Sequence, residues 1–366
     1  GKAYLPMAMS TQIFLASLVI GIIAGLITGC IGAGGGFVIT PALMSAGVRG
    51  IMAVGTDMFH IFAKAIMGTA VHRKLGNVNV PLAIWFVVGS MVGVTFGGQI
   101  NRALYLKNPV LSDTFISSIY VIMLGFLGFY SLYDFIKSGK KQAADTGDGE
   151  DTGLTSFATK LQSVKLPPMV HFDQDVVPGG RKLSGVFLIV VGFVVGFIAA
   201  IMGVGGGFVT FPIYVYGLGV SSFTTVGTDV LQIIFTAGYS SIFQYGLYGY
   251  VFYTLAMGLL IGSLIGVQMG ALTTKVVHGR YIRGFYAVAI LAGFTNRLFA
   301  LPGKLADMEV ISLPGALGAH LNTAGTIIFF AIMAGFAIWV LAKFFGNLSS
   351  LRQPVQVEGG VTDGFN

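Results

Sequence analysis

Apolar stretches of about twenty residues recur along the chain, separated by short polar breaks. At ~1.5 Å per residue, a helix of that length crosses a hydrocarbon layer of ~30 Å. Lipid offers no hydrogen-bond partners, so a crossing backbone must satisfy its own, as a helix does. The sequence therefore predicts an all-α polytopic membrane protein. We expect spanning helices at 51–71, 80–100, 114–136, 224–244, 252–274, 281–301 and 321–341.

Composition agrees with a membrane protein, because 55% of the 366 residues are hydrophobic and only 10% are charged. The net charge of +7 does not predict a nucleic-acid partner, because Lys and Arg lie at the ends of apolar stretches, as membrane topology requires. Cys30 is the only cysteine, which excludes an intrachain disulfide and a cysteine metal cluster. The sequence contains neither a Walker A motif nor HExxH or paired catalytic carboxylates. We expect no cofactor, no metal and no enzymatic activity.

The chain repeats itself. The run Gly-Ala-Gly-Gly-Gly-Phe-Val at 32–38 recurs as Gly-Val-Gly-Gly-Gly-Phe-Val at 203–209, and Val-Gly-Thr-Asp at 54–57 recurs at 226–229. A segment with an acidic run and Pro167-Pro168 separates the halves and is typical of an exposed linker. These features predict a first repeat at 1–136, a polar linker at 137–184, a second repeat at 185–301, and an extra C-terminal transmembrane helix and tail at 302–366.

Three consecutive glycines interrupt one apolar region in each half. Glycine weakens helices and permits backbone turns, so each region should break. Such a break is tolerated at membrane depth where it is buried in protein or lines a wet cavity. We therefore expect two re-entrant helical hairpins, 13–28 with 37–44 and 186–200 with 208–216.

The basic residues favour hairpins that return to the side from which they started. With a cytoplasmic linker, this arrangement also places the basic residues at 72–74, at 275–283 and in the C-terminal tail in the cytoplasm. Hairpins that crossed fully would put 275–283 outside. Each repeat then has one hairpin and three crossings, so the halves form inverted-topology repeats, the plan of many secondary transporters.

The motifs from Gly32 to Pro41 and from Gly203 to Pro212, with the paired Gly-Thr-Asp, resemble the sulfite exporter TauE/SafE family, also described as the toluene sulfonate uptake permease group. The resemblance covers roughly 13–300. It implies a multi-pass transporter in the cytoplasmic (inner) membrane of a prokaryote that carries sulfite, organosulfonates or related sulfur anions. The long linker and the helix at 321–341 are less typical of this family.

The glycine-rich breaks are the first candidate site. The second arm of a broken helix begins with free backbone N–H groups, which together with the helix dipole favour an anion. The alternative is close helix packing through small residues. The residues expected to bind substrate are Gly34, Gly35, Gly36, Phe37, Gly205, Gly206, Gly207 and Phe208.

Charged side chains inside apolar stretches are the second group of candidates. Asp57, His60 and Lys64 are three and four residues apart, which places them on one helix face. Such groups are costly in lipid unless they face the protein interior. We expect Lys64 to bind the anion, and Asp57, His60 and the repeated Asp229 to serve a coupling proton or sodium. Alternatively, the aspartates cap helices near the membrane surface and Lys64 pairs with Asp57.

Three further residues are candidates for substrate binding: Thr56, Thr228 and Arg297. The guanidinium of Arg297 has a fork of donors that matches an oxyanion. Its position near Pro302 favours the alternative that Arg297 ends its helix and reaches the membrane interface.

The sequence thus predicts a secondary transporter that alternates access to a small sulfur-containing anion at a midplane site. An anion channel is the nearest alternative, and a membrane enzyme is a weaker one. The expected partners are the anion, a coupling ion and the lipid bilayer, and a homo-oligomer is compatible with the sequence.

Overall fold

The computed structural model describes residues 11–31, 35–74, 76–141, 156–174, 178–274, 276–277, 279–314 and 316–347. Most of these residues are helical, and eight helices are long and apolar enough to cross a membrane: α1, α3, α4, α5, α7, α10, α11 and α12. The predicted all-α polytopic membrane protein is thereby confirmed. The helical elements of the bundle are α1 (Thr11–Ile31), α2 (Gly36–Ser45), α3 (Gly50–Lys74), α4 (Val80–Lys107), α5 (Pro109–Lys141), α7 (Gly185–Met202), α8 (Gly207–Pro212), η1 (Ile213–Leu218), α9 (Ser222–Tyr239), η2 (Ser240–Tyr245), η3 (Gly246–Tyr248), α10 (Tyr253–Thr273), α11 (Gly279–Asp307) and α12 (Leu317–Gly346).

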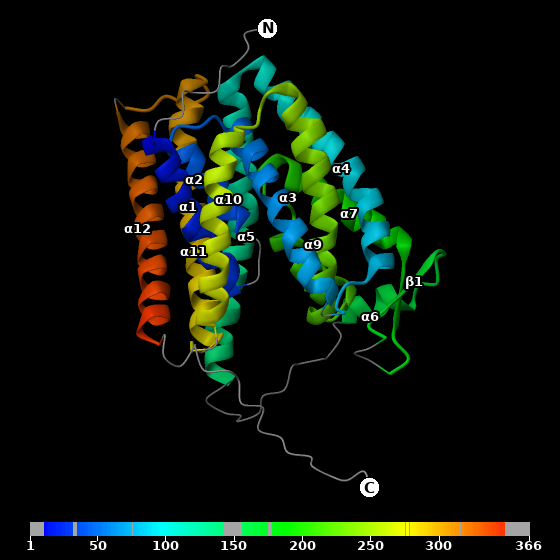
Figure 1. The fold of residues 1–366 in the computed structure, drawn as a ribbon. Helices are drawn as coiled ribbons and strands as arrows, with labels where there is room; N and C mark the ends of the chain where they lie inside the picture. The colour runs from blue at the N-terminus through cyan, green and yellow to red at the C-terminus, as the bar shows by residue number, and fades with distance from the viewer. Residues whose placement is uncertain are drawn as a thin grey trace.

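Two parallel helix pairs join the halves: α1 lies along α10, and α4 lies along α7 (Figure 1). Glycines make these contacts so close that the backbones touch. A Cβ atom at Gly21 would meet the backbone of Leu259, and one at Gly93 would meet the backbone of Phe193. Small residues permit such close packing between membrane helices. Each pair therefore fastens the first helix of one half to a later helix of the other.

The equivalent helices α3 and α9 pass each other in opposite directions. Gly55 near the start of α3 lies beside Tyr245 at the end of η2, whereas Gly68 lies beside Val230 near the start of α9. A pair of equivalent helices that runs antiparallel is the geometry that an inverted repeat produces. α9 is not among the eight apolar spans because it carries a row of polar side chains, including Thr225, Asp229, Gln232 and Thr236.

Both glycine-rich regions form hairpins whose breaks meet in the middle of the bundle. α1 runs with α10, and after the break α2 leads back to the start of α3. α7 runs with α4, and α8 continues through η1 to Leu218 at the face where α7 began. A Cβ at Gly36 would meet Val204, and the rings of Phe37 and Phe208 lie 6.2 Å apart.

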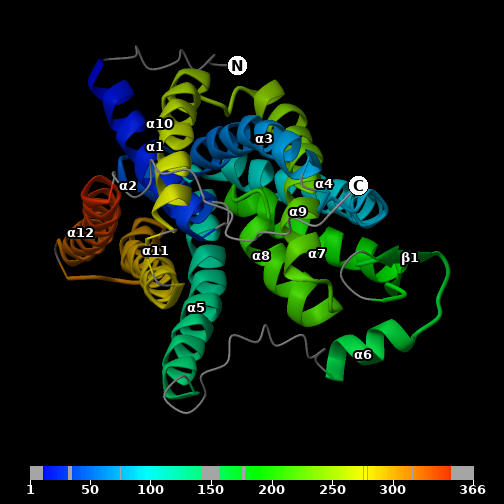
Figure 2. The same ribbon diagram turned by 60° about the horizontal axis from the view of Figure 1, so that its bottom comes forward.

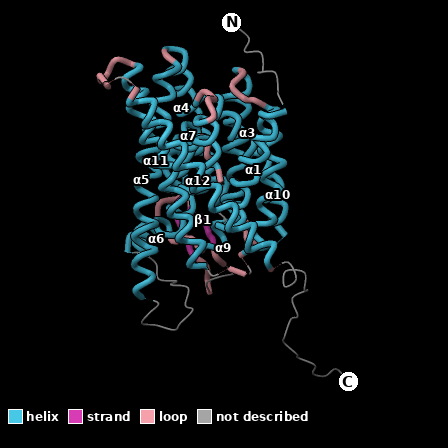
Figure 3. The backbone as a smooth tube through the Cα atoms, turned by 90° about the vertical axis from the view of Figure 1, so that its left-hand side faces the viewer, coloured by secondary structure: helices cyan, strands magenta, loops and turns pink. Residues whose placement is uncertain are grey.

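The segment between the halves is folded and docked, rather than only an exposed linker. It contains α6 (Ser156–Ser163) and an antiparallel strand pair, β1 (Met169–Phe172) with β2 (Arg181–Ser184), paired from Met169 with Ser184 to Phe172 with Arg181. Phe172 and Leu183 are fully buried. Figure 2 shows this segment beside α7, and Figure 3 shows the strands toward one end of the bundle. That end is called the linker face below, and α12 also ends there (Figure 1).

The docking rests on polar contacts with the loop between η1 and α9. Gln162 donates to the Leu218 carbonyl at 2.8 Å, and Arg181 donates to the Gly219 carbonyl at 2.6 Å. The Asp173 carboxylate accepts from the Ser221 amide at 2.8 Å and from its hydroxyl at 2.6 Å. The segment thus holds the end of the second hairpin in place.

Candidate functional site

A cavity of about 480 Å³ lies between the end of α1, α3, α9, α10, α11 and the second hairpin. Its lining residues belong to the middle of α3 and α9 and to the parts of the helices nearer the linker face, as far as His72. Most of them are apolar, among them Ile61, Phe208 and Ile233. A mostly apolar cavity with a few polar groups is the usual form of a small-molecule site.

Lys64 is the cationic group within this cavity. Its ammonium nitrogen is buried and has no hydrogen-bond partner among the described residues. Among the described residues it forms no ion pair with Asp57 or Asp229 within 4.0 Å, although the Asp57 carboxylate is near enough to attract its charge. A buried charge without a partner is costly, and a bound anion would remove that cost.

Asp229 lines the same cavity. It is 9% exposed, and its Oδ1 atom has no hydrogen-bond partner among the described residues. It lies within α9, which begins at Ser222 and is capped by the hydroxyl of Ser221. Asp229 is therefore not a helix cap.

The second break faces the cavity through Gly207 and Phe208. Gly205 and Gly206 have positive φ angles of 68° and 97°, which favour glycine because other residues are strained there. Neither of these two glycines lines the cavity. Their role in this structure is to turn the chain so that Gly207 and Phe208 reach the cavity wall.

The first break is packed differently. The Gly35 amide donates to the Thr28 hydroxyl at 2.9 Å, and Gly36 contacts Ile61 and Val204. Phe37 is fully buried against Phe208 and Tyr286 and, like Gly35 and Gly36, does not line the cavity. Gly34 lies outside the described residues. The two breaks meet, but the described part of the first does not open into the cavity.

Asp57 and His60 form a closed polar network in the core. Asp57 Oδ2 accepts from the Thr40 hydroxyl at 3.0 Å, and Oδ1 lies 3.3 Å from His60 Nδ1. His60 Nε2 lies 2.8 Å from the Ser263 hydroxyl oxygen. Both side chains are fully buried within α3, so Asp57 does not cap a helix near a surface. They link α2, α3 and α10 and do not line the cavity.

Thr56 and Thr228 take symmetric places away from the cavity. The Thr56 hydroxyl accepts from the Phe252 amide at 3.0 Å, immediately before α10. The Thr228 hydroxyl accepts from the Asn79 amide at 2.9 Å, immediately before α4. Each satisfies a backbone donor at a helix start, which is a structural contribution.

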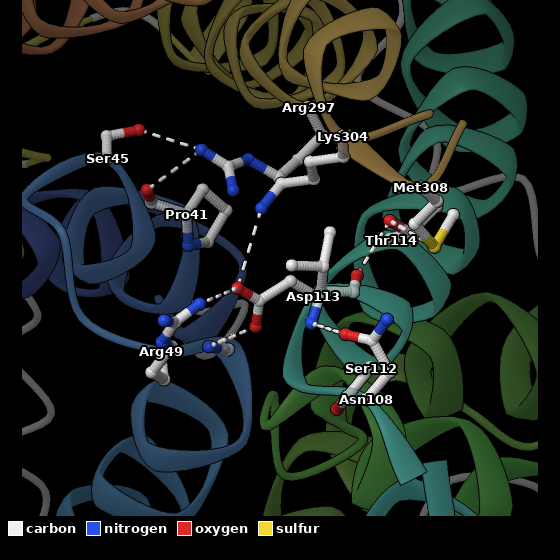
Figure 4. Close-up of polar contacts among 12 residues, drawn as sticks. Pro41, Ser45, Arg49, Asn108, Ser112, Asp113, Thr114, Arg297, Lys304 and Met308 are labelled. Carbon is white, nitrogen blue, oxygen red and sulfur yellow. Dashed lines mark hydrogen bonds and ion pairs between the residues drawn. The ribbon is translucent and has the colours of Figure 1, made fainter. Parts of the chain in front are cut away.

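Arg297 neither ends its helix nor reaches the cavity. α11 continues to Asp307, and the Arg297 side chain is 2% exposed. Figure 4 shows its guanidinium directed at α2, where it donates to the Ser45 hydroxyl at 2.8 Å and to the Pro41 carbonyl at 3.4 Å. The interpretation of Arg297 as a terminal, interface-reaching residue is wrong, because Pro302 lies inside α11 and does not stop it.

A cluster of charged residues next to Arg297 was not predicted from the sequence. Asp113, at the start of α5, accepts from the Gly50 amide at 2.7 Å and lies 3.6 Å from Lys304 and 3.8 Å from Arg49 (Figure 4). It connects α3, α5 and α11 at the face opposite the linker. An aspartate at the edge of an apolar stretch carries no sequence signal that separates this role from ordinary solvation.

A membrane-spanning helical bundle with an internal cavity and a free buried cation defines the class of a membrane transporter. The sulfite exporter TauE/SafE family model matches residues 17–296, and the chain belongs to that family. Among curated proteins, it is 23% identical over 270 residues to the probable membrane transporter protein YjnA of Bacillus subtilis, covering 72% of this chain and 89% of that protein.

Two further curated relatives are also named membrane transporters. The chain is 24% identical to YunE of Bacillus subtilis (74% of this chain, 91% of that protein) and 24% identical to MJ0441 of Methanocaldococcus jannaschii (73% and 88%), each named a probable membrane transporter protein. No solved structure matches. The chain is therefore a multi-pass membrane transporter of the TauE/SafE family.

Proposed function

We propose that this protein is a secondary transporter for a small sulfur-containing oxyanion, sulfite or an organosulfonate, and that Lys64 binds the anion. The observation that carries the proposal is the buried Lys64 ammonium, which lies in the cavity without a partner. Gly207 and Phe208 add the start of a helical arm to the same wall. The family name supports a sulfur oxyanion, and the positive charge supports an anion.

Alternating access is the mechanism we propose for this carrier. The cavity extends toward the linker face, whereas Arg297 and Asp113 tie α11 to α2, α3 and α5 on the opposite side. These positions support a carrier state in which the site is reached from the linker face. We further propose that the linker and the C-terminal tail lie in the cytoplasm of a prokaryote, with the protein in the inner membrane; the tail lies outside the described residues.

The test is a binding screen on detergent-purified protein with sulfite, sulfate, thiosulfate and short sulfonates. Lys64→Met should weaken binding of the preferred anion by about ten- to 150-fold, because a hydrogen bond to a charged group contributes about 1.5–3 kcal/mol. The matched control is Arg73→Met, which removes an exposed cation near the end of the same helix and should leave the affinity unchanged. Equal affinities of the two variants would refute the role of Lys64.

Transport assays separate a carrier from a channel. Proteoliposomes should show saturable uptake and counterflow, in which unlabelled anion inside accelerates entry of labelled anion. Unitary currents without counterflow would favour the channel instead.

A further inference from the structure

The two repeated aspartates differ in their surroundings. Asp57 is fully buried, with Oδ2 bonded to Thr40 at 3.0 Å and Oδ1 3.3 Å from His60. Asp229 has a hydrogen bond with the Thr210 side chain, but it faces the cavity, and its Oδ1 atom has no partner among the described residues. The repeated motif therefore places the Asp57 carboxylate where the protein satisfies it and the Asp229 carboxylate where an ion in the cavity can reach it.

The charges around Asp229 do not supply a counter-ion. The titratable groups that face it or its cavity are Lys64 and His72 from α3, Tyr214 from η1 and Tyr286 from α11. None of these forms an ion pair with Asp229 within 4.0 Å among the described side chains. The Tyr214 hydroxyl already accepts from Gln232. An anion arriving at Lys64 would therefore meet a carboxylate that has no ion-pair partner within 4.0 Å among the described residues, and the like charge opposes its binding.

A proton on Asp229 removes the repulsion between its carboxylate and the anion. Added to Asp229 Oδ1, it turns the carboxylate into a neutral carboxylic acid, which also gains an O–H donor that the cavity otherwise lacks on that wall. The described residues contain no cluster of three or more histidine, cysteine or carboxylate side chains, the groups that hold a transition-metal ion. The Thr28 hydroxyl in the cavity wall is already occupied, since it donates to Ala24 and accepts from Gly35.

We propose that Asp229 is the proton-coupling residue of this transporter, so that one proton on Asp229 and one anion on Lys64 enter and leave the cavity together. This inference rests on the proposed transport of an anion. In each cycle, the proton adds to the carboxylate when the anion binds and leaves when the anion leaves, so no other reactant is needed. Asp57 and His60 remain a fixed pair that holds α2, α3 and α10 together.

The experiment uses the full chain in proteoliposomes with the membrane potential clamped at zero. With one proton per anion, an inward proton gradient of one pH unit should drive roughly tenfold accumulation by the wild type. Asp229→Asn, a neutral isostere of the protonated acid, should keep anion counterflow and lose this accumulation entirely. Asp229→Glu, which retains a carboxylic acid, should keep accumulation.

Several outcomes would overturn the inference. Proton-driven accumulation by Asp229→Asn would show that the proton binds elsewhere, and loss of coupling in Asp57→Asn alone would assign it to the other repeat. Accumulation that follows only a sodium gradient would also overturn it. A further outcome would also overturn it: a sulfonate that carries an ammonium group binds more weakly to Asp229→Asn, and its transport moves no proton. Asp229 would then bind the ammonium group of the substrate. Absence of counterflow for every tested anion in the wild type would instead reject the proposed function itself.

A direct measurement covers the case in which Asp229→Asn does not fold. Addition of the anion to wild-type protein in weakly buffered detergent solution should withdraw one proton per bound anion, as a pH-indicator dye reports. Lys64→Met, measured in the same way, should withdraw none at the same anion concentration. Binding of the anion by the wild type without proton uptake would overturn the inference.

Discussion

The parallel pairing of α4 with α7 predicts a large difference between two Gly→Ala substitutions. A Cβ at Gly93 would meet the backbone of both Phe193 and Phe197 on α7, which no side-chain rotation can relieve. Gly335 on α12 has no atom within 4 Å of the same position and is exposed. In a helix, Ala is more favourable than Gly by about 0.5–1 kcal/mol. Gly335→Ala should therefore stabilise the protein by about that amount.

At Gly93 the helix preference is outweighed. Extra atoms in a close-packed contact cost about 1–3 kcal/mol, so Gly93→Ala should destabilise the protein by about 1–2 kcal/mol after the gain in helix preference. Because the gain in helix preference is the same in both, the two variants should differ by the packing cost, about 1–3 kcal/mol. Unfolding by SDS titration in mixed micelles can be followed by Trp85, which packs against Gly185 of α7, after Trp339→Phe removes the other tryptophan. Equal stability of the two variants would refute backbone contact between α4 and α7.

Two further predictions concern polar contacts at the opposite faces. Asp113→Asn should lower the free energy of unfolding by about 1–3 kcal/mol, because it weakens the hydrogen bond to Gly50 and removes the charge facing Lys304. SDS titration measures this change, and an unchanged stability would contradict the prediction. Asp173→Ala should release the linker segment and raise the hydrogen-exchange rate of α6, β1 and β2 about tenfold or more. Asp173→Asn still accepts from Ser221 and should have a smaller effect. Equal exchange in both variants would count against this docking contact.

Apolar length and glycine runs predicted most of the bundle. The expected span at 80–100 lies within α4, and each glycine-rich region breaks within a few residues of the expected place. These features are local, because a membrane requires a helix wherever the chain is apolar enough. The folded linker was missed because its strands are only four residues long, and they are stable through their contacts with the second hairpin.

The site was predictable only in part, because residue type does not reveal which wall a side chain occupies. A cation inside an apolar stretch pointed to Lys64, and the structure places it in the cavity. Arg297 met the same criterion but lies on the far side of the break, bonded to Ser45. Pro302 misled the interpretation of Arg297, because a membrane helix can accommodate a proline that would end a soluble one. What distinguishes Lys64 from Arg297 is how their helices pack against the others, and this packing depends on contacts between distant segments of the chain.

The repeats also contain matched residues with equivalent contacts and matched residues whose contacts differ. Two equivalent halves that pack against each other place equivalent residues in equivalent contacts, so packing tends to retain the same residue in both. Thr56 and Thr228 fit this rule, since each accepts from the backbone amide before a helix of the other half. A single small anion between the halves has no reason to contact both equally.

Residues that touch such a ligand are therefore free to differ between the repeats. Counted from the shared aspartates, Lys64 corresponds to Thr236, and His60 corresponds to Gln232. Thr236 bonds to Ser90, whereas the Lys64 ammonium has no hydrogen-bond partner in the part of the chain that the structure describes. The shared aspartates differ in their surroundings, because both oxygens of Asp57 have partners from its own repeat, whereas Asp229 is bonded to Thr210 and keeps Oδ1 without a partner at the cavity among the described residues. A different residue at the matched position thus marks Lys64, and different surroundings of the same residue mark Asp229, the two groups that we assign to the anion and the proton.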